Sequence, residues 1–115
     1  MTRYFTVEQA ALLLPEIQRL LARARRAQSK LGWEAEAIGE LEESITEIQQ
    51  HGAHLKDLDE GLVDFPTRYL GNEVLLCYRM GDAGISHWHG AETGDRGRRR
   101  IDQRFLENHS GGSIQ

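Results

Sequence analysis

The hydrophobic period of this sequence changes near Gly52, and that change divides the chain into a helical part and a β part. Before Gly52 apolar residues recur every three or four positions, as on one face of an α-helix, whereas after it they alternate, as in a strand with one buried face. We therefore predict an α+β fold, an N-terminal helical hairpin with a small three- or four-stranded antiparallel sheet. We expect a single domain over residues 1–108, with the hairpin at about 6–51, the β region at about 53–101 and a flexible tail at 109–115.

Two apolar stripes predict the hairpin. Each stripe has the spacing of one helical face and is followed by a glycine, Gly32 or Gly52, which is typical of a helix C-terminus. The first stripe comprises Ile17, Leu20, Leu21, Ala24, Ala27 and Leu31, and the second comprises Ile38, Leu41, Ile45 and Ile48. Two antiparallel helices joined near Gly32 are the simplest arrangement.

The start of the first helix is indicated by a capping box, with Thr6 as N-cap and Gln9 reaching back to it. Pro15 removes one helical hydrogen bond and disfavours a helical Leu14. Either the helix kinks at Leu14, or a second helix begins with Pro15 in its first turn.

Charge is unevenly distributed along the hairpin. Residues 1–31 carry six basic and two acidic side chains, whereas residues 32–64 carry one basic and ten acidic. The basic stripe comprises Arg19, Arg23, Arg26 and Lys30, and the acidic stripe comprises Glu36, Glu40, Glu43 and Glu47. We expect both stripes to point mostly outward, away from each other. A two-helix hairpin leaves one flank of each helix uncovered, so we expect its apolar seam to pack against the sheet or against a second copy, and we expect a homodimer formed through the helices.

Composition argues against several classes of protein. Apolar residues make up 39% and charged residues 28%, which is not the composition of a disordered chain. No stretch approaches the roughly 20 apolar residues of a membrane helix. The net charge is −4 and the arginine cluster at 96–100 lacks interleaved aromatic residues, so we do not expect nucleic-acid binding. Cys77 is the sole cysteine, which fits a reducing compartment, and we expect a cytoplasmic location.

The β region contains three candidate strands. Residues 62–65 form a short one that Pro66 should end, 73–80 form the strongest, and 85–89 form another short one. Short glycine-containing loops between them indicate an antiparallel meander, with a turn at Gly71.

Alternation within these strands predicts the candidate site. If the valine, leucine, tyrosine and tryptophan positions face the core, the opposite face collects Asp64, Cys77, Arg79, His87 and His89. Two imidazoles on one strand face are a common way to present nitrogen ligands to a metal. We therefore predict a divalent transition-metal site at His87 and His89, completed by Asp64 or by Glu92.

Other interpretations remain open. The same face can bind a small anion through Arg79 and Arg98, with Cys77 beside them. The histidines can instead be exposed or hydrogen-bonded, and Cys77 can be a small buried residue. The sequence assigns no catalytic residue and leaves open whether the protein is an enzyme. The alternative function is a non-catalytic interaction module that oligomerises through its helical hairpin.

Several segments resemble a bacterial family known as domain of unknown function 2203. They are residues 4–8 (YFTVE), 13–15 (LLP), 61–66 (GLVDFP), 76–79 (LCYR) and 88–89 (WH). The resemblance implies a small bacterial cytoplasmic protein without an established activity, and it transfers no catalytic residue. Members of the family usually carry a glutamate directly after the Trp-His pair, where this chain has Gly90, so Glu92 is the nearest carboxylate.

Overall fold

The helical hairpin predicted from the two apolar stripes is present in the computed structural model, which describes residues 2–113. It consists of α1 (Val7–Ser29) and α2 (Ala37–Gln50). The Thr6 hydroxyl accepts a hydrogen bond from the Gln9 backbone N–H, and the Gln9 side chain accepts one from the Thr6 N–H, so the capping box is confirmed. Of the two alternatives left open at Pro15, the second helix is wrong, because α1 runs through this residue. Pro15 and Ala11 are both exposed, so water can reach the carbonyl that loses its partner.

The sheet has more strands than the three or four predicted. In spatial order it contains β2 (His54–Asp57), β3 (Leu62–Tyr69), β4 (Asn72–Arg79), β5 (His87–Gly90) and β6 (Arg99–Arg100), all antiparallel to their neighbours, and β7 (His109–Ser110) also pairs with β3. The additional strands have two to four residues, too few to display a period of two. The antiparallel α+β arrangement itself is confirmed.

Pro66 does not end its strand, contrary to the prediction. Its carbonyl accepts a hydrogen bond of 2.7 Å from the Phe5 N–H, on the edge of β3 that lies between β2 and β7. A residue's N–H and C=O point to the same side of a strand, so the missing N–H of Pro66 lies on this edge and removes no bond to β4.

The C-terminal segment is held by pairing. Residues 109–115 were predicted as a flexible tail, yet β7 pairs with β3, and β8 (Gly112–Ser113) pairs with β1 (Arg3–Tyr4). Residues 114–115 lie outside the described residues. Between β6 and β7 runs a short helix, α3 (Gln103–Asn108), whose Phe105 side chain is buried against the sheet core.

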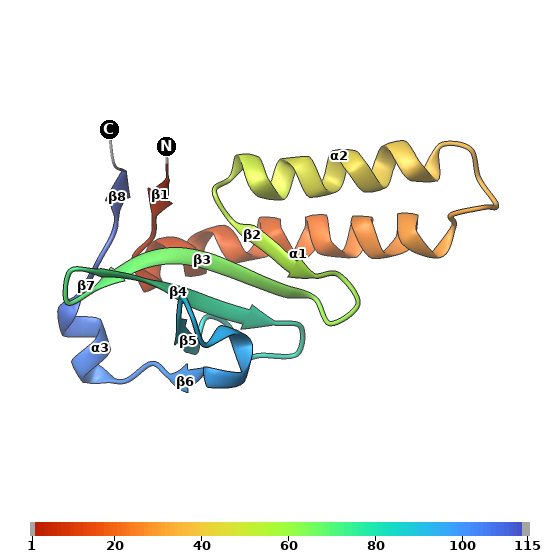
Figure 1. Cartoon of the computed structure of the whole chain (residues 1–115). Coiled ribbons are helices and arrows are strands. Elements are labelled where there is room, and N and C mark those ends of the chain that lie inside the picture. The colour runs from red at the N-terminus through yellow and green to blue at the C-terminus, as the bar shows by residue number, and fades with distance from the viewer. Residues whose placement is uncertain (1, 114–115) are drawn as a thin grey trace.

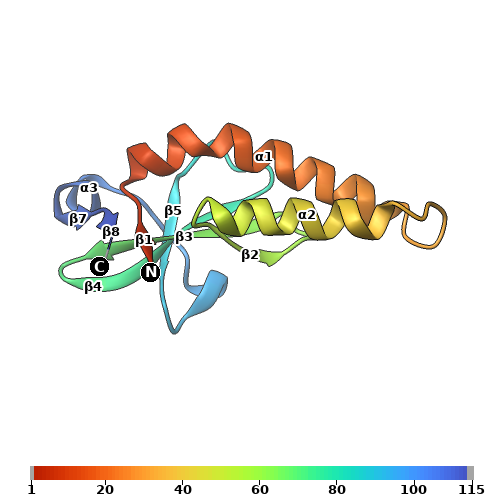
Figure 2. The same cartoon turned by 90° about the horizontal axis from the view of Figure 1, so that it is seen from above.

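The core lies between the hairpin and one face of the sheet. From the sheet it takes Val63, Phe65, Val74, Leu76 and Tyr78, and from α1 and α2 it takes Ala10, Leu14, Ile17, Leu20, Leu21 and Ile48. Figure 1 and Figure 2 show both helices on one side of β3 and β4, with the connection from β5 to β6 on the other. The alternation predicted for β3 and β4 is therefore confirmed.

The hairpin extends past the sheet. In both views the connection between α1 and α2 and the turns next to it project beyond the strands, and the molecule is 48 Å along its longest axis. The exposure of the apolar seam of α2 therefore increases toward the tip of the hairpin. Ile48 is fully buried over the sheet, whereas Ile38 near the tip is 59% exposed.

The sequence suggested that the two charged stripes point outward and away from each other. In the structure, arginines of the basic stripe instead contact glutamates of the acidic stripe. The Arg23 guanidinium lies 3.2 Å from the Glu43 carboxylate and 3.7 Å from the Glu47 carboxylate (nitrogen to oxygen). The Arg19 guanidinium lies 3.9 Å from the Glu47 carboxylate. The long arginine side chains reach across the groove between the helices, although their Cα positions face away from the seam. No helix among the described residues is both long enough and apolar enough to cross a membrane.

Candidate metal centre

The face of the sheet turned away from the helices carries a row of ionisable side chains. Asp64 on β3 is in register with Cys77 on β4, which is in register with His87 on β5. His89 lies two residues further along β5, opposite Leu75. Because side chains alternate along a strand, these positions share the face opposite the core, as predicted.

This polar face is buried rather than open. Asp64 and His89 are 2% and 3% exposed, and Cys77 is fully enclosed. The cover is the connection from β5 to β6, which includes a single turn of 3₁₀ helix, η1 (Gly94–Gly97). Glycine permits this tight path: a Cβ on Gly97 would lie 2.6 Å from the Thr93 side chain.

Three ligand atoms converge under this cover. The carboxylate of Asp64, the sulfur of Cys77 and a ring nitrogen of His89 all lie within 4.8 Å of one another. His89 Nε2 is 3.1 Å from Asp64 Oδ1, and His89 Nδ1 is 2.8 Å from the Gly90 carbonyl oxygen. A carbonyl only accepts, so Nδ1 carries a proton and Nε2 is the nitrogen turned toward Asp64 and Cys77. This orientation by a backbone carbonyl is the usual support of a metal-binding histidine.

Cys77 is a protonated thiol in this environment. Burial above all, together with the nearby Asp64 carboxylate, raises the pKa of Cys77 to about 12, although the positive charge of Arg98 acts in the opposite direction. A metal ion binds the thiolate, so coordination at Cys77 must release this proton.

Two of the predicted ligands lie outside this group. His87, although in register with Cys77, directs Nδ1 to the Ser86 hydroxyl at 2.8 Å. Burial first, and then the charge of Arg98, lower the pKa of His87. Glu92 is exposed, and neither residue belongs to a ligand group among the described residues. The third member of the group is Cys77, which the sequence analysis had assigned to the anion-binding residues.

The predicted anion-binding arginines are tied to a loop aspartate. Arg98 Nη2 donates to Asp82 Oδ2 at 2.5 Å, and the same oxygen accepts the Arg79 backbone N–H at 2.9 Å. Both arginines are half-buried. Asp82 thus offsets the charge of the Arg98 guanidinium next to Cys77.

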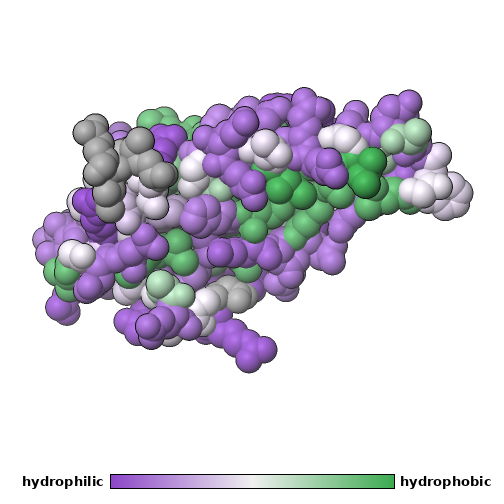
Figure 3. Space-filling model, turned by 45° about the horizontal axis from the view of Figure 1, so that its top comes forward, coloured by the Kyte–Doolittle hydropathy of each residue, from purple (hydrophilic) through white to green (hydrophobic). Residues whose placement is uncertain are grey.

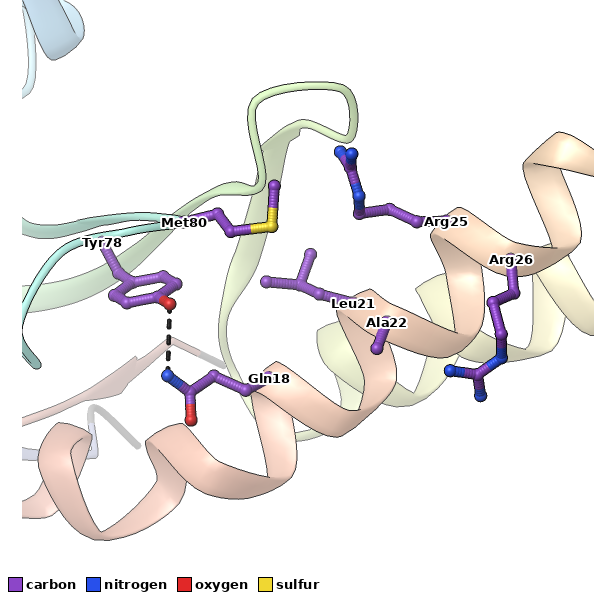
Figure 4. A pocket seen from close by; sticks show the side chains of 7 residues that line it. All are labelled: Gln18, Leu21, Ala22, Arg25, Arg26, Tyr78 and Met80. Carbon is purple, nitrogen blue, oxygen red and sulfur yellow. Dashed lines mark hydrogen bonds between the residues drawn. The ribbon is translucent and has the colours of Figure 1, made fainter.

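Two cavities differ in chemistry. A cavity of about 220 Å³ borders the ligand group and is lined by Lys56, Leu62, Asp64, Leu75, His89, Ala91 and Gly94. A larger one of about 430 Å³ lies between α1 and the end of β4 (Figure 4), where Leu21 faces Met80 and the Gln18 amide donates to the Tyr78 hydroxyl. Among the described residues, the lining of the larger cavity includes no histidine, cysteine or carboxylate, whereas the smaller cavity adjoins metal-binding side chains.

Comparison with known proteins identifies the family. The model of the family described as an uncharacterized conserved protein (DUF2203) matches residues 33–101. This span is more than half of the chain, so the chain belongs to that family, as the resemblance indicated. No curated protein and no solved structure matches the chain. The matched span contains Asp64, Cys77 and His89 and leaves out α1.

Proposed function

For this member of the DUF2203 family, we propose a metal-binding function in which Asp64, Cys77 and His89 hold one divalent transition metal. The observation that carries the proposal is the convergence of three different ligand atoms within 4.8 Å under a closed cover. A thiolate, an imidazole and a carboxylate together favour Zn²⁺ or Fe²⁺ over Mg²⁺ and Ca²⁺, which prefer oxygen ligands only.

The geometry needs little adjustment to accept Zn²⁺. Bonds of about 2.0–2.3 Å to nitrogen, oxygen and sulfur place tetrahedral ligands roughly 3–4 Å apart. The His89 and Asp64 atoms already stand 3.1 Å apart. A metal would replace the proton shared along this contact and the proton of Cys77, which removes the cost of burying these groups without full partners.

Three protein ligands leave a fourth position open. Structural zinc sites have four protein ligands, whereas sites that bind a water or a substrate have three. Asp64 and His89 line the cavity of about 220 Å³, so the open position faces this cavity. The proposal is therefore a site that binds metal together with an exchangeable ligand.

Metal analysis of protein purified without a polyhistidine tag tests this proposal. We expect about one Zn²⁺ per chain in the wild type, and its loss in Cys77→Ser and His89→Ala. His87→Ala is the matched control, because His87 lies on the same strand face but outside the ligand group, and it should retain the metal. Circular dichroism confirms that each variant is folded. A wild type that holds no metal and gains no thermal stability with Zn²⁺, Fe²⁺, Mn²⁺ or Ni²⁺ contradicts the proposal.

A second function, self-association through the hairpin, is favoured by its exposed tip. Leu31, Trp33 and Ile38 are 41%, 86% and 59% exposed, and Figure 3 shows apolar surface along the hairpin toward its far end. Two copies that cover this surface would form a homodimer. We expect Ile38→Asp to weaken association in analytical ultracentrifugation, with Thr46→Asp on the exposed side of α2 as control. A monomeric wild type at high concentration contradicts this function.

A further inference from the structure

The cavity beside the ligand group has one cationic side chain, Lys56. The strand β2 pairs with β3 so that His54 is opposite Asp64 and Asp57 is opposite Leu62, with a bulge at Lys56 between them. Bulges commonly redirect a side chain toward a functional site. Here the extra residue lines the same cavity as Asp64 and His89.

No side chain that the structure describes forms an ion pair with the Lys56 ammonium, which is exposed. The other lysine of the chain, Lys30, lies 3.8 Å from Glu34. A divalent metal bound to the Asp64 carboxylate and the Cys77 thiolate forms a neutral unit. Of the described residues that line the loaded cavity, Lys56 then contributes the one uncompensated charge, which is positive and favours an anion.

We propose that this cavity binds a small oxyanion, a carboxylate or a phosphate, with one oxygen on the open metal position and another on the Lys56 ammonium. The inference rests on the metal site proposed above and names the class of its exchangeable ligand. The volume of about 220 Å³ is below the roughly 300–1,000 Å³ of pockets for drug-sized molecules, so the anion must be small. Leu62 and Leu75 form apolar walls, and a charged contact is stronger beside apolar surface than in bulk water.

Titration calorimetry on zinc-loaded protein tests the inference, with inorganic phosphate and acetate as separate probes. We expect Lys56→Gln to bind the anion about tenfold more weakly or worse, because it loses one charge-assisted hydrogen bond. Lys30→Gln is the matched control and should bind like the wild type. Binding of phosphate alone, of acetate alone or of both supports the inference and identifies the oxyanion.

Two results overturn the inference while leaving the metal site intact: binding of neither anion by zinc-loaded wild type, and equal affinity in Lys56→Gln. Metal content is measured on the same samples. Protein that holds no zinc after loading therefore reveals the failure of the proposed function itself, and with it the loss of the coordination position that the anion would occupy.

Discussion

The outer face of the sheet and the far end of the hairpin depart from ordinary burial in opposite ways. On the sheet an aspartate and a histidine are almost completely enclosed, whereas at the hairpin tip Trp33 is 86% exposed. Charged groups are rarely buried unless they are paired, and large apolar patches are rarely exposed unless they bind something. The comparison shows why the two proposals differ in kind: the buried ionisable groups support the proposal of a bound ion, and the exposed apolar side chains support the proposal of a second copy.

The two regions also differ in what a substitution should cost. The ligand group lies within a sheet and under a cover, so a change there leaves a neighbour buried without its partner. The distal hairpin is surrounded by water in the monomer, so a change there removes few contacts. Substitutions that compare the two regions therefore test whether the assignment of each is correct.

The largest effect is expected from His89→Ala in metal-free protein. Removal of the ring leaves the enclosed Asp64 carboxylate without its partner, and loss of one member of a buried pair costs about 3–5 kcal/mol. Urea unfolding measures the change, with His87→Ala as control because His87 is only half-buried. A cost for His89→Ala below about 1 kcal/mol would mean that this face tolerates unpaired groups.

The next effect compares two isoleucines of the same seam. Ile48→Ala should cost about 2–5 kcal/mol of unfolding free energy, because the side chain is fully buried over the sheet. Ile38→Ala should cost at most about 0.5 kcal/mol in the monomer, because its side chain is 59% exposed. Equal costs at low protein concentration would show that the tip is covered, as in a tight dimer.

A smaller effect is expected where the charged stripes meet. Arg23→Ala removes the contacts with Glu43 and Glu47 across the hairpin and should cost at most about 1 kcal/mol, since these side chains are partly exposed. When unfolding is measured in 1 M salt, the cost should be smaller still, because the Debye screening length falls to about 3 Å. A larger, salt-independent cost would indicate that Arg23 packs rather than pairs.

The smallest effect concerns pH. Burial and Arg98 lower the pKa of His87 below the ordinary 6.5, and Arg100 acts in the same direction while Asp82 opposes it. The unfolded chain therefore binds a proton at His87 more readily than the folded chain does. The stability that depends on a neutral His87 is present above pH 6.5, and it is lost as the pH falls through the lower pKa of His87 in the folded chain. Metal-free wild type should lose more stability between pH 7.5 and pH 5 than His87→Gln does. Parallel pH profiles of the two proteins would contradict this reasoning.

The sequence predicted the shared face but not the residues that converge on it. Strict alternation places Asp64, Cys77, His87 and His89 on one side of the sheet, and periodicity alone reveals this. Which of them meet depends on side-chain rotamers and on hydrogen bonds: His87 turns to Ser86, while His89 crosses diagonally to Asp64. The hydrophobic periodicity of the sequence does not determine which side chains on the shared face contact one another.

The sequence also could not predict where the hairpin loses its support. The apolar residues of α2 keep the same helical period along the whole helix, yet Ile48 is buried and Ile38 is exposed because the hairpin extends beyond the sheet. The extent of the sheet depends in turn on strands of two residues, such as β6, and on a proline whose missing N–H lies in the gap between β2 and β7. These are long-range outcomes that a local pattern does not contain.

Anomalous diffraction at the zinc absorption edge, from crystals of zinc-loaded protein, tests the central claim most directly. The account predicts one peak under the connection from β5 to β6, at about 2.0–2.3 Å from Cys77 Sγ, His89 Nε2 and an Asp64 carboxylate oxygen. A peak at His87 or Glu92 instead, or an intact contact between His89 and Asp64 with no peak beside Cys77, would contradict it.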